Sequence, residues 1–289
     1  MTTLEGLAGS APLQMLSVSI IGLMVGSFLN VVTLRLPRML ELEWAAQCAE
    51  LRGEPLPETP ALGLARPASH CPSCQSPVHA LDNIPIVSWL LLRGRCRTCH
   101  ARISARYPIV EAVTALLSLV TWWQLGWSTT AAAGLVLTWW LIALTIIDLD
   151  HQLLPDNLTL PGVWLGLLLS LAGVFVGPTE AIIGASAGYL ALWSVYQAFR
   201  LVTGKEGMGY GDFKLLALLG AWLGWQSLPL VIILSSLVGA VVGMALIAGL
   251  GRHRDQPIPF GPYLAAAGWI AMLWGDRITG AYLRFSGLN

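Results

Sequence analysis

Residues 112–147 form a run of 36 residues without a single Asp, Glu, Lys or Arg. A second uncharged run covers residues 215–251. Both exceed the roughly 20 apolar residues that a helix needs to cross a bilayer. Charged residues make up 11% of the chain, against roughly 25% in soluble domains. The sequence therefore predicts an all-α polytopic membrane protein that contacts the lipid bilayer over much of its surface.

Breaks between apolar segments set the expected number of transmembrane helices at about eight. The first helix is expected over about 13–34, and the charged, moderately periodic segment 39–52 is a candidate for a short soluble helix. Run 112–147 is interrupted at 126–130 and run 215–251 at 224–229, so each is expected to form two helices, since Gly, Ser, Thr and Pro favour turns there. The remaining segments are about 157–176, 181–199 and 258–275.

Basic residues indicate the orientation. Nine of the 16 Lys and Arg residues lie between residues 35 and 107, after the first predicted helix. Cytoplasmic connections carry such an excess, so we expect this block in the cytoplasm and both termini outside. Asp148 and Asp212 then lie at the same, cytoplasmic side of the membrane. The formal net charge of zero gives no signal for a nucleic-acid partner.

Four cysteines in the basic block form two CxxC pairs with 21 residues between them. This is close to the spacing of zinc ribbons, in which two knuckles supply four thiolates. The alternatives are disulfides or a redox dithiol, but a cytoplasmic location disfavours stable disulfides. We expect a small zinc-ribbon-like lobe with a structural zinc. Its predicted ligands are Cys71, Cys74, Cys96 and Cys99.

Asp148 and Asp212 lie at the edges of uncharged runs, where an ionised carboxylate is costly. Two carboxyl groups that share a site hold one proton between them. Such a pair supplies a base that activates water and an acid that protonates a leaving amine, as in aspartic proteases. The glycine-rich residues 207–211 before Asp212 favour a tight helix entry. The alternative for Asp212 is a helix-capping role.

Further motifs accompany the cysteines and aspartates along nearly the whole chain, and together they closely resemble those of the bacterial type IV prepilin peptidases, relatives of the GxGD intramembrane aspartic proteases. The motifs are Gly26-Ser27-Phe28-Leu29-Asn30-Val31-Val32, Arg35-Leu36-Pro37, Asn83-Ile84-Pro85 with Ser88-Trp89-Leu90, Arg93-Gly94-Arg95-Cys96, Arg106-Tyr107-Pro108 with Glu111, and Gly209-Tyr210-Gly211-Asp212.

The resemblance implies that Asp148 and Asp212 are the catalytic pair of a multi-pass enzyme of the bacterial inner membrane. Members of this family remove the basic leader of prepilins and pseudopilins after a Gly, at the cytoplasmic membrane face. They then methylate the new N-terminal residue with S-adenosylmethionine as methyl donor. They serve type IV pilus assembly, type II secretion or both.

The methyl-transfer site is harder to place, because the chain has no GxGxxG nucleotide loop. By elimination we assign it to the basic zinc lobe and the adjoining helix ends. Gly94 is one candidate for contact with the methyl donor, and a turn glycine is the alternative. Glu111 is the other candidate, for the cofactor or the substrate amine, and a helix cap is its alternative.

These inferences predict three domains. Residues 1–34 form the first transmembrane helix, residues 35–107 the cytoplasmic zinc-binding lobe and residues 108–289 the membrane aspartic peptidase domain. Two other functions stay open: a peptidase without methyltransferase activity, and a proton-coupled transporter. A transporter predicts a repeat between the two halves, which the sequence does not show.

Overall fold

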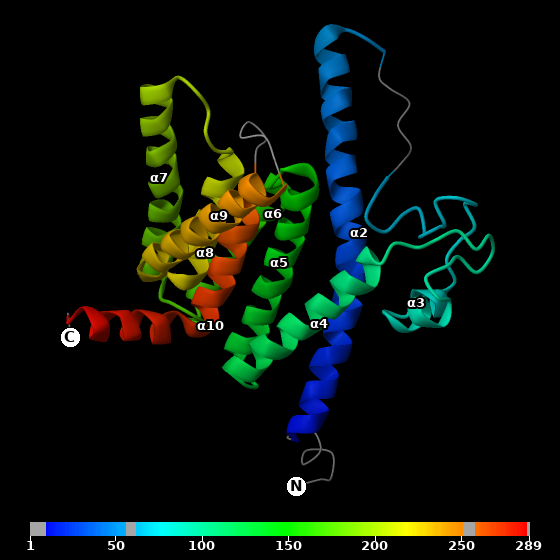
Figure 1. The fold of residues 1–289 in the computed structure, drawn as a ribbon, viewed down its shortest axis with the longest axis horizontal. Helices are drawn as coiled ribbons and strands as arrows, with labels where there is room; N and C mark the ends of the chain where they lie inside the picture. Colours follow the sequence, from blue (N-terminus) through cyan, green and yellow to red (C-terminus); the bar gives the residue numbers. More distant parts are fainter. Residues whose placement is uncertain (1–9, 56–61, 251–257, 288–289) are drawn as a thin grey trace. The chain divides into compact units, whose positions relative to one another are not determined.

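The structure, a computed structural model, describes residues 10–55, 62–250 and 258–287. It divides into two compact units, Met1–Gln124 and Leu125–Asn289, each described by itself below. Across the described ranges the chain is helical, with two isolated antiparallel bridges and no strand (Figure 1). The predicted all-α class is confirmed.

The first unit begins with one unbroken helix, α2 (Ala11–Arg52). The helix expected over about 13–34 therefore continues for more than four further turns. The predicted transmembrane helix and the candidate soluble helix over 39–52 are one continuous helix, since the segment after Pro37 is rich in Leu, Glu, Ala and Gln, which favour helix in water as well. Gly53 ends α2 in the left-handed conformation, with φ 65°. Residues 1–9 of the predicted first domain lie outside the described residues.

Helix α4 (Arg106–Leu125) crosses α2 at close range (Figure 1). A Cβ atom added to Gly26 would lie 2.7 Å from the Cα of Glu111, and one added to Gly22 would lie 2.7 Å from the Cα of Ala115. Small residues four apart are the usual means of bringing membrane helices together. The segment between α2 and α4 carries two short helices, η1 (Ala80–Asn83) and α3 (Val87–Leu91).

The second unit packs its helices around α8, which is buried along almost its whole length from Asp212 to Trp222. Helices α6, α7 and α10 lie against α8, and α10 also lies against α5 and α9. A helix that is apolar on every side suits such an enclosed position. The helices are α5 (Thr129–His151), α6 (Asp156–Ser170), α7 (Pro178–Thr203), α8 (Tyr210–Leu223), α9 (Leu228–Leu250) and α10 (Gly261–Ser286).

A helix occupies each apolar segment predicted from the sequence, and both long runs break where expected. Among the described residues, four helical segments are long and apolar enough to cross a membrane by themselves. Helices α6 and α8 have only 15 and 14 residues. The four candidate spans are Ala11–Arg52, Arg106–Leu125, Thr129–His151 and Trp225–Leu246.

Candidate functional site

Asp148 lies in the last turn of α5, and its side chain is buried, with 5% of the residue exposed. Its Oδ2 atom accepts a hydrogen bond of 3.0 Å from the backbone N–H of Gly261, the first residue of α10. The partial positive charge at a helix N-terminus stabilises a carboxylate there. A Cβ at position 261 would come within 2.6 Å of that oxygen, so a larger residue there would displace the Asp148 carboxyl group.

Asp212 is the third residue of α8 and is 8% exposed. The N-cap of α8 is Gly209, and its backbone also interacts with the Asp212 carboxyl group, which is compatible with a capping role in addition to a catalytic one. The next residue, Phe213, is fully buried and packs its ring edge-on against Tyr189, with ring centroids 5.8 Å apart. This packing fixes the start of α8 and hence the position of the Asp212 carboxyl group.

The Asp148 carboxyl group lies within electrostatic range of the Asp212 carboxyl group. Leu154 joins the helix ends around them. A Cβ added to Gly211 would lie 2.7 Å from Leu154 Cβ, and one added to Gly261 would lie 3.2 Å from Leu154 Cδ1. The ends of α5, α8 and α10 therefore meet at one point. Two buried carboxyl groups in such a place can share a proton and act as an acid and a base.

The acids that follow Asp148 along the chain have other surroundings. Asp150 is exposed. Asp156 is the first residue of α6, whose N-cap is Pro155, and its Oδ1 lies 2.5 Å from the Nζ of Lys214. Lys214 follows Asp212 by two residues in α8. The ion pair therefore links the start of α6 to the first turn of α8.

The four cysteines of the two CxxC pairs gather into one cluster in the first unit. Their sulfur atoms all lie within 4.8 Å of one another. The Sγ atoms of Cys71 and Cys99 are 3.7 Å apart, and those of Cys74 and Cys96 are 4.0 Å apart. A tetrahedral zinc with Zn–S bonds of about 2.3 Å would place its sulfurs about 3.8 Å apart. These separations far exceed a disulfide bond of about 2.05 Å, so the thiols are free and suited to hold a metal ion.

Both cysteine pairs have the same local backbone. In each, the N–H of the first cysteine donates to the carbonyl five residues later, and the N–H four residues later donates back to that cysteine's carbonyl. The residue after the second cysteine has positive φ in both, 59° at Gln75 and 58° at His100. Each pair is closed by one of the isolated bridges. The hydrogen-bonded pairs are Cys71–Ser76, Gln75–Cys71, Cys96–Ala101 and His100–Cys96.

The backbone also favours thiolate at one ligand. The N–H groups of Cys99 and Thr98 point at the Cys96 sulfur and lower the pKa of its thiol to about 6. The thiolate is the form that binds metals. Cys48, on α2, is exposed and lies outside the cluster.

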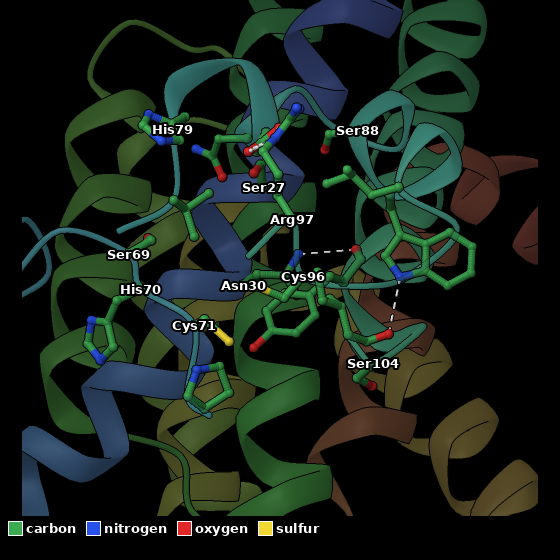
Figure 2. Close-up of a pocket in the computed structure, with 18 of the residues that line it drawn as sticks. Ser27, Asn30, Ser69, His70, Cys71, His79, Ser88, Cys96, Arg97 and Ser104 are labelled. Atoms are coloured by element: carbon green, nitrogen blue, oxygen red, sulfur yellow. Dashed lines mark hydrogen bonds and ion pairs between the residues drawn. The ribbon is translucent and has the colours of Figure 1, made fainter. Parts of the chain in front are cut away.

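A cavity of about 480 Å³ lies beside this cluster, within the first unit (Figure 2). Its volume is in the range of small-molecule sites. Glu111 lines the cavity, is 7% exposed, and accepts a hydrogen bond of 2.7 Å from the backbone N–H of Ile86. Glu111 is the sixth residue of α4, so it is not a cap of that helix.

Gly94 lies behind the cavity wall and not on it. Its φ is +64°, and an added Cβ would lie 2.8 Å from the ring of Trp89. Trp89 itself lines the cavity, and its Nε1–H donates to the carbonyl of Ile103 at 3.2 Å. This placement agrees with the turn-glycine interpretation and gives Gly94 a supporting position beneath Trp89.

The sequence did not single out several residues that complete these sites. Gly261 donates to Asp148, Leu154 packs between the helix ends, and Lys214 pairs with Asp156. A Gly-Pro pair at the start of an apolar run, Gly261-Pro262, is a helix-start signal and could have indicated the first of these. The other two depend on contacts between distant segments, for which the sequence holds no local signal.

Comparisons with known proteins agree with this arrangement. Residues 20–125, which contain the four cysteines and Glu111, match the family described as Bacterial Peptidase A24 N-terminal domain. Residues 135–244, which contain both aspartates, match the Type IV leader peptidase family. No solved structure matches the chain.

Curated relatives cover almost the whole chain. A prepilin leader peptidase/N-methyltransferase of Aeromonas hydrophila is 61% identical over 273 residues, which is 92% of each protein. One of Aeromonas salmonicida is 59% identical over 98% of this chain and 99% of that protein. One of Pseudomonas aeruginosa is 54% identical over the full length of both. This chain therefore belongs to the type IV leader peptidase family.

Proposed function

We propose that this chain removes the basic leader peptide of prepilins and pseudopilins after a Gly and then methylates the new N-terminal residue, with S-adenosylmethionine as the methyl donor. The names of relatives that are 54–61% identical support both activities. The observation that carries the proposal is the pair Asp148 and Asp212. Both are buried, come from different helices and lie within electrostatic range of each other.

In the proposed cleavage, the ionised member of the pair takes a proton from water, whose oxygen attacks the scissile carbonyl carbon. The protonated member polarises the carbonyl oxygen and donates its proton to the leaving amine as the C–N bond breaks. The Gly261 N–H holds the Asp148 carboxyl group in place at 3.0 Å. Because the two residues share one proton, activity is expected to rise and fall with pH in a bell shape.

The proposed topology has eight spans, α2 and α4 to α10, in the bacterial inner membrane. The nine basic residues between 35 and 107 support a cytoplasmic position for the segment after the first span. Helix α8, at 14 residues, is shorter than a bilayer core, but neighbouring helices enclose it. Both acids would then lie at the cytoplasmic face, where a basic leader is attracted to them.

The proposed domains follow from this topology. Residues 1–34 form the membrane part of α2, residues 35–107 form the cytoplasmic lobe, and residues 108–289 form the peptidase domain. We assign zinc to the four cysteine thiolates, in a closed structural site. S-adenosylmethionine supplies the methyl group, and the cavity beside Glu111 is our candidate for its site, with Gly94 supporting the cavity wall through Trp89.

One experiment tests both activities. Purified full-length protein is incubated with a prepilin, with and without S-adenosylmethionine, and the mass of the substrate's N-terminus is measured. Wild type is expected to cleave and to add one methyl group. Asp148→Ala and Asp212→Ala are expected to leave the leader in place, whereas the control Asp150→Ala cleaves normally. Cleavage without methylation would leave a peptidase alone, and wild-type protein that does neither would favour the transporter.

A further inference from the structure

Two buried acceptor groups face the same cavity of the first unit, Glu111 on α4 and Asn30 on α2. They are 7% and 3% exposed. Glu111 Oε2 accepts one hydrogen bond from Ile86, and the side chain of Ser27 also interacts with the carboxylate. A carboxylate has about four acceptor positions, so Glu111 keeps capacity for a donor in the cavity. Figure 2 shows Ser27 and Asn30 among the lining residues.

The Oδ1 atom of Asn30 is buried and has no hydrogen-bond partner. The amide nitrogen of the same side chain donates to the carbonyls of Gly26, at 3.3 Å, and Tyr107, at 3.2 Å. These two bonds fix which amide atom is the oxygen. An unpaired buried acceptor is destabilising, and such groups in native proteins are usually satisfied by a ligand, an ion or water.

The charges of the cavity favour a particular ligand at this end. A protonated primary amine has three donors and a positive charge, which complement the Glu111 carboxylate and the Asn30 carbonyl oxygen. Arginine side chains also line the cavity, and one of them, Arg97, is 62% exposed and held by Asp82 at 2.5 Å. The cavity therefore combines buried acceptors with basic side chains that suit the carboxylate of a methyl donor.

We propose that Glu111 and Asn30 bind the new N-terminal amine of the cleaved substrate and hold it for methylation. This inference rests on the proposed function and names the amine subsite within it. Before methyl transfer, the Glu111 carboxylate accepts one proton from the bound ammonium group, which leaves a lone pair on the nitrogen. The nitrogen then forms a bond to the methyl carbon as the carbon–sulfur bond breaks with its electron pair left on sulfur.

The test measures binding as well as turnover. Full-length protein is titrated with a synthetic peptide of a mature pilin N-terminus that begins with a free Phe amine, and with the same peptide N-acetylated. Glu111→Gln keeps an oxygen for the Ile86 N–H but removes the charge. We expect it to bind the free-amine peptide about tenfold more weakly and the acetylated peptide unchanged, since a charged hydrogen bond is replaced by a neutral one.

The same variant is expected to lose methylation of the free-amine peptide while cleaving a prepilin at the wild-type rate. Asn30→Leu is expected to weaken binding of the free-amine peptide alone. Ser118→Ala is the matched control, because Ser118 is also buried on α4 but is not a lining residue. It should bind both peptides as wild type does.

Three outcomes separate the inference from the proposed function. Wild-type protein that methylates but does not distinguish the free amine from the acetylated peptide overturns the inference. So does a Glu111→Gln variant that binds and methylates the free-amine peptide like wild type. Wild-type protein that cleaves but never methylates overturns the methyltransferase half of the proposed function instead.

Discussion

The two units position their site residues in different ways. In the second unit, Asp148 and Asp212 lie at helix ends whose positions are set by a large apolar core around α8. In the first unit, the four cysteines lie on short turns, and the neighbouring helix α3 has no buried residue. Helix packing can hold carboxyl groups without further help, whereas we expect a lobe with so little core to depend on a metal at its four cysteines to fold. The two activities should therefore fail separately when the two units are perturbed separately.

The largest effect is expected at the acid pair. Asp212→Asn removes the shared proton, and cleavage of a prepilin should fall by about 100-fold to 10,000-fold, the usual contribution of an acid–base group. Methylation of a peptide with an already mature N-terminus should persist, because the site proposed for it lies in the other unit. Cleavage rates and peptide masses from the same preparation measure both. Asp150→Asn serves as the control, and equal loss in both variants would contradict a special role for Asp212.

The next effect is expected at the cysteine cluster. Cys96→Ser should lose the bound metal, and residues 62–105 should exchange amide hydrogens much faster, since structural zinc sites contribute about 10–16 kcal/mol to folding. Cleavage should stay within a few-fold of wild type, while methylation is lost. Metal content and hydrogen exchange by mass spectrometry provide the readouts.

Cys48→Ser is the matched variant, because Cys48 is an exposed cysteine outside the cluster. It should keep its metal and its exchange pattern. A Cys96→Ser protein with full metal content would show that three cysteines are enough to hold the ion. A wild-type exchange pattern in this variant would show that the turns fold without all four ligands.

A smaller effect is expected at Gly94. Gly94→Ala places a methyl group at φ +64°, 2.8 Å from the Trp89 ring, so Trp89 must move away from the cavity wall. We expect methylation to fall about tenfold with cleavage unchanged. The displacement of Trp89 adds to the cost of about 1–2 kcal/mol for placing an alanine in the left-handed backbone conformation at position 94.

Gly53→Ala separates strain from displacement. Gly53 has φ +65°, nearly the same conformation, and no described atom lies within 4 Å of an added Cβ. This variant should show a similar small loss of thermal stability and full methylation. If both variants methylate equally, Gly94 matters only for its backbone conformation.

The smallest effect is expected at the ion pair of Asp156 and Lys214, whose side chains are 55% and 24% exposed. A pair of this exposure contributes at most about 1 kcal/mol. Lys214→Met should slow cleavage about twofold, and the double variant with Asp156→Asn should be no slower. A double-mutant cycle on cleavage rates measures this. A loss as large as that of Asp212→Asn would mean that Lys214 takes part in the chemistry.

The sequence predicted the helical architecture well, because charge-free runs and glycine- or proline-containing breaks are local signals. The breaks at 126–130 and 224–229 are examples, and the structure has a helix on each side of both. The sequence did not indicate that the segments 13–34 and 39–52 form one helix, because Arg35 marks a change in polarity and not a change in backbone. A helix can continue from lipid into water without any local signal at the boundary.

For the sites, the spacing of residues along the sequence predicted only those contacts that form within a short segment. The CxxC pairs predicted a cluster because each pair sits on one turn, and the turns repeat the same geometry. The contact of Gly261 with Asp148 spans 113 residues of sequence, and the amide nitrogen of Asn30 donates to the carbonyl of Tyr107, 77 residues away. Such partners are set by how helices pack, which hydropathy does not specify.

The unbroken α2 has a mechanical consequence. Its 42 residues make a rod of about 63 Å at about 1.5 Å per residue, roughly twice the thickness of a bilayer's hydrocarbon. In the proposed topology, the part of α2 that leaves the membrane sets the distance between the lipid surface and Gly53. Each residue inserted between Met39 and Arg52 would raise that end by about 1.5 Å and rotate it by about 100°. An insertion or deletion in this part of α2 therefore changes the distance of the lobe from the membrane and its rotation about the helix axis together.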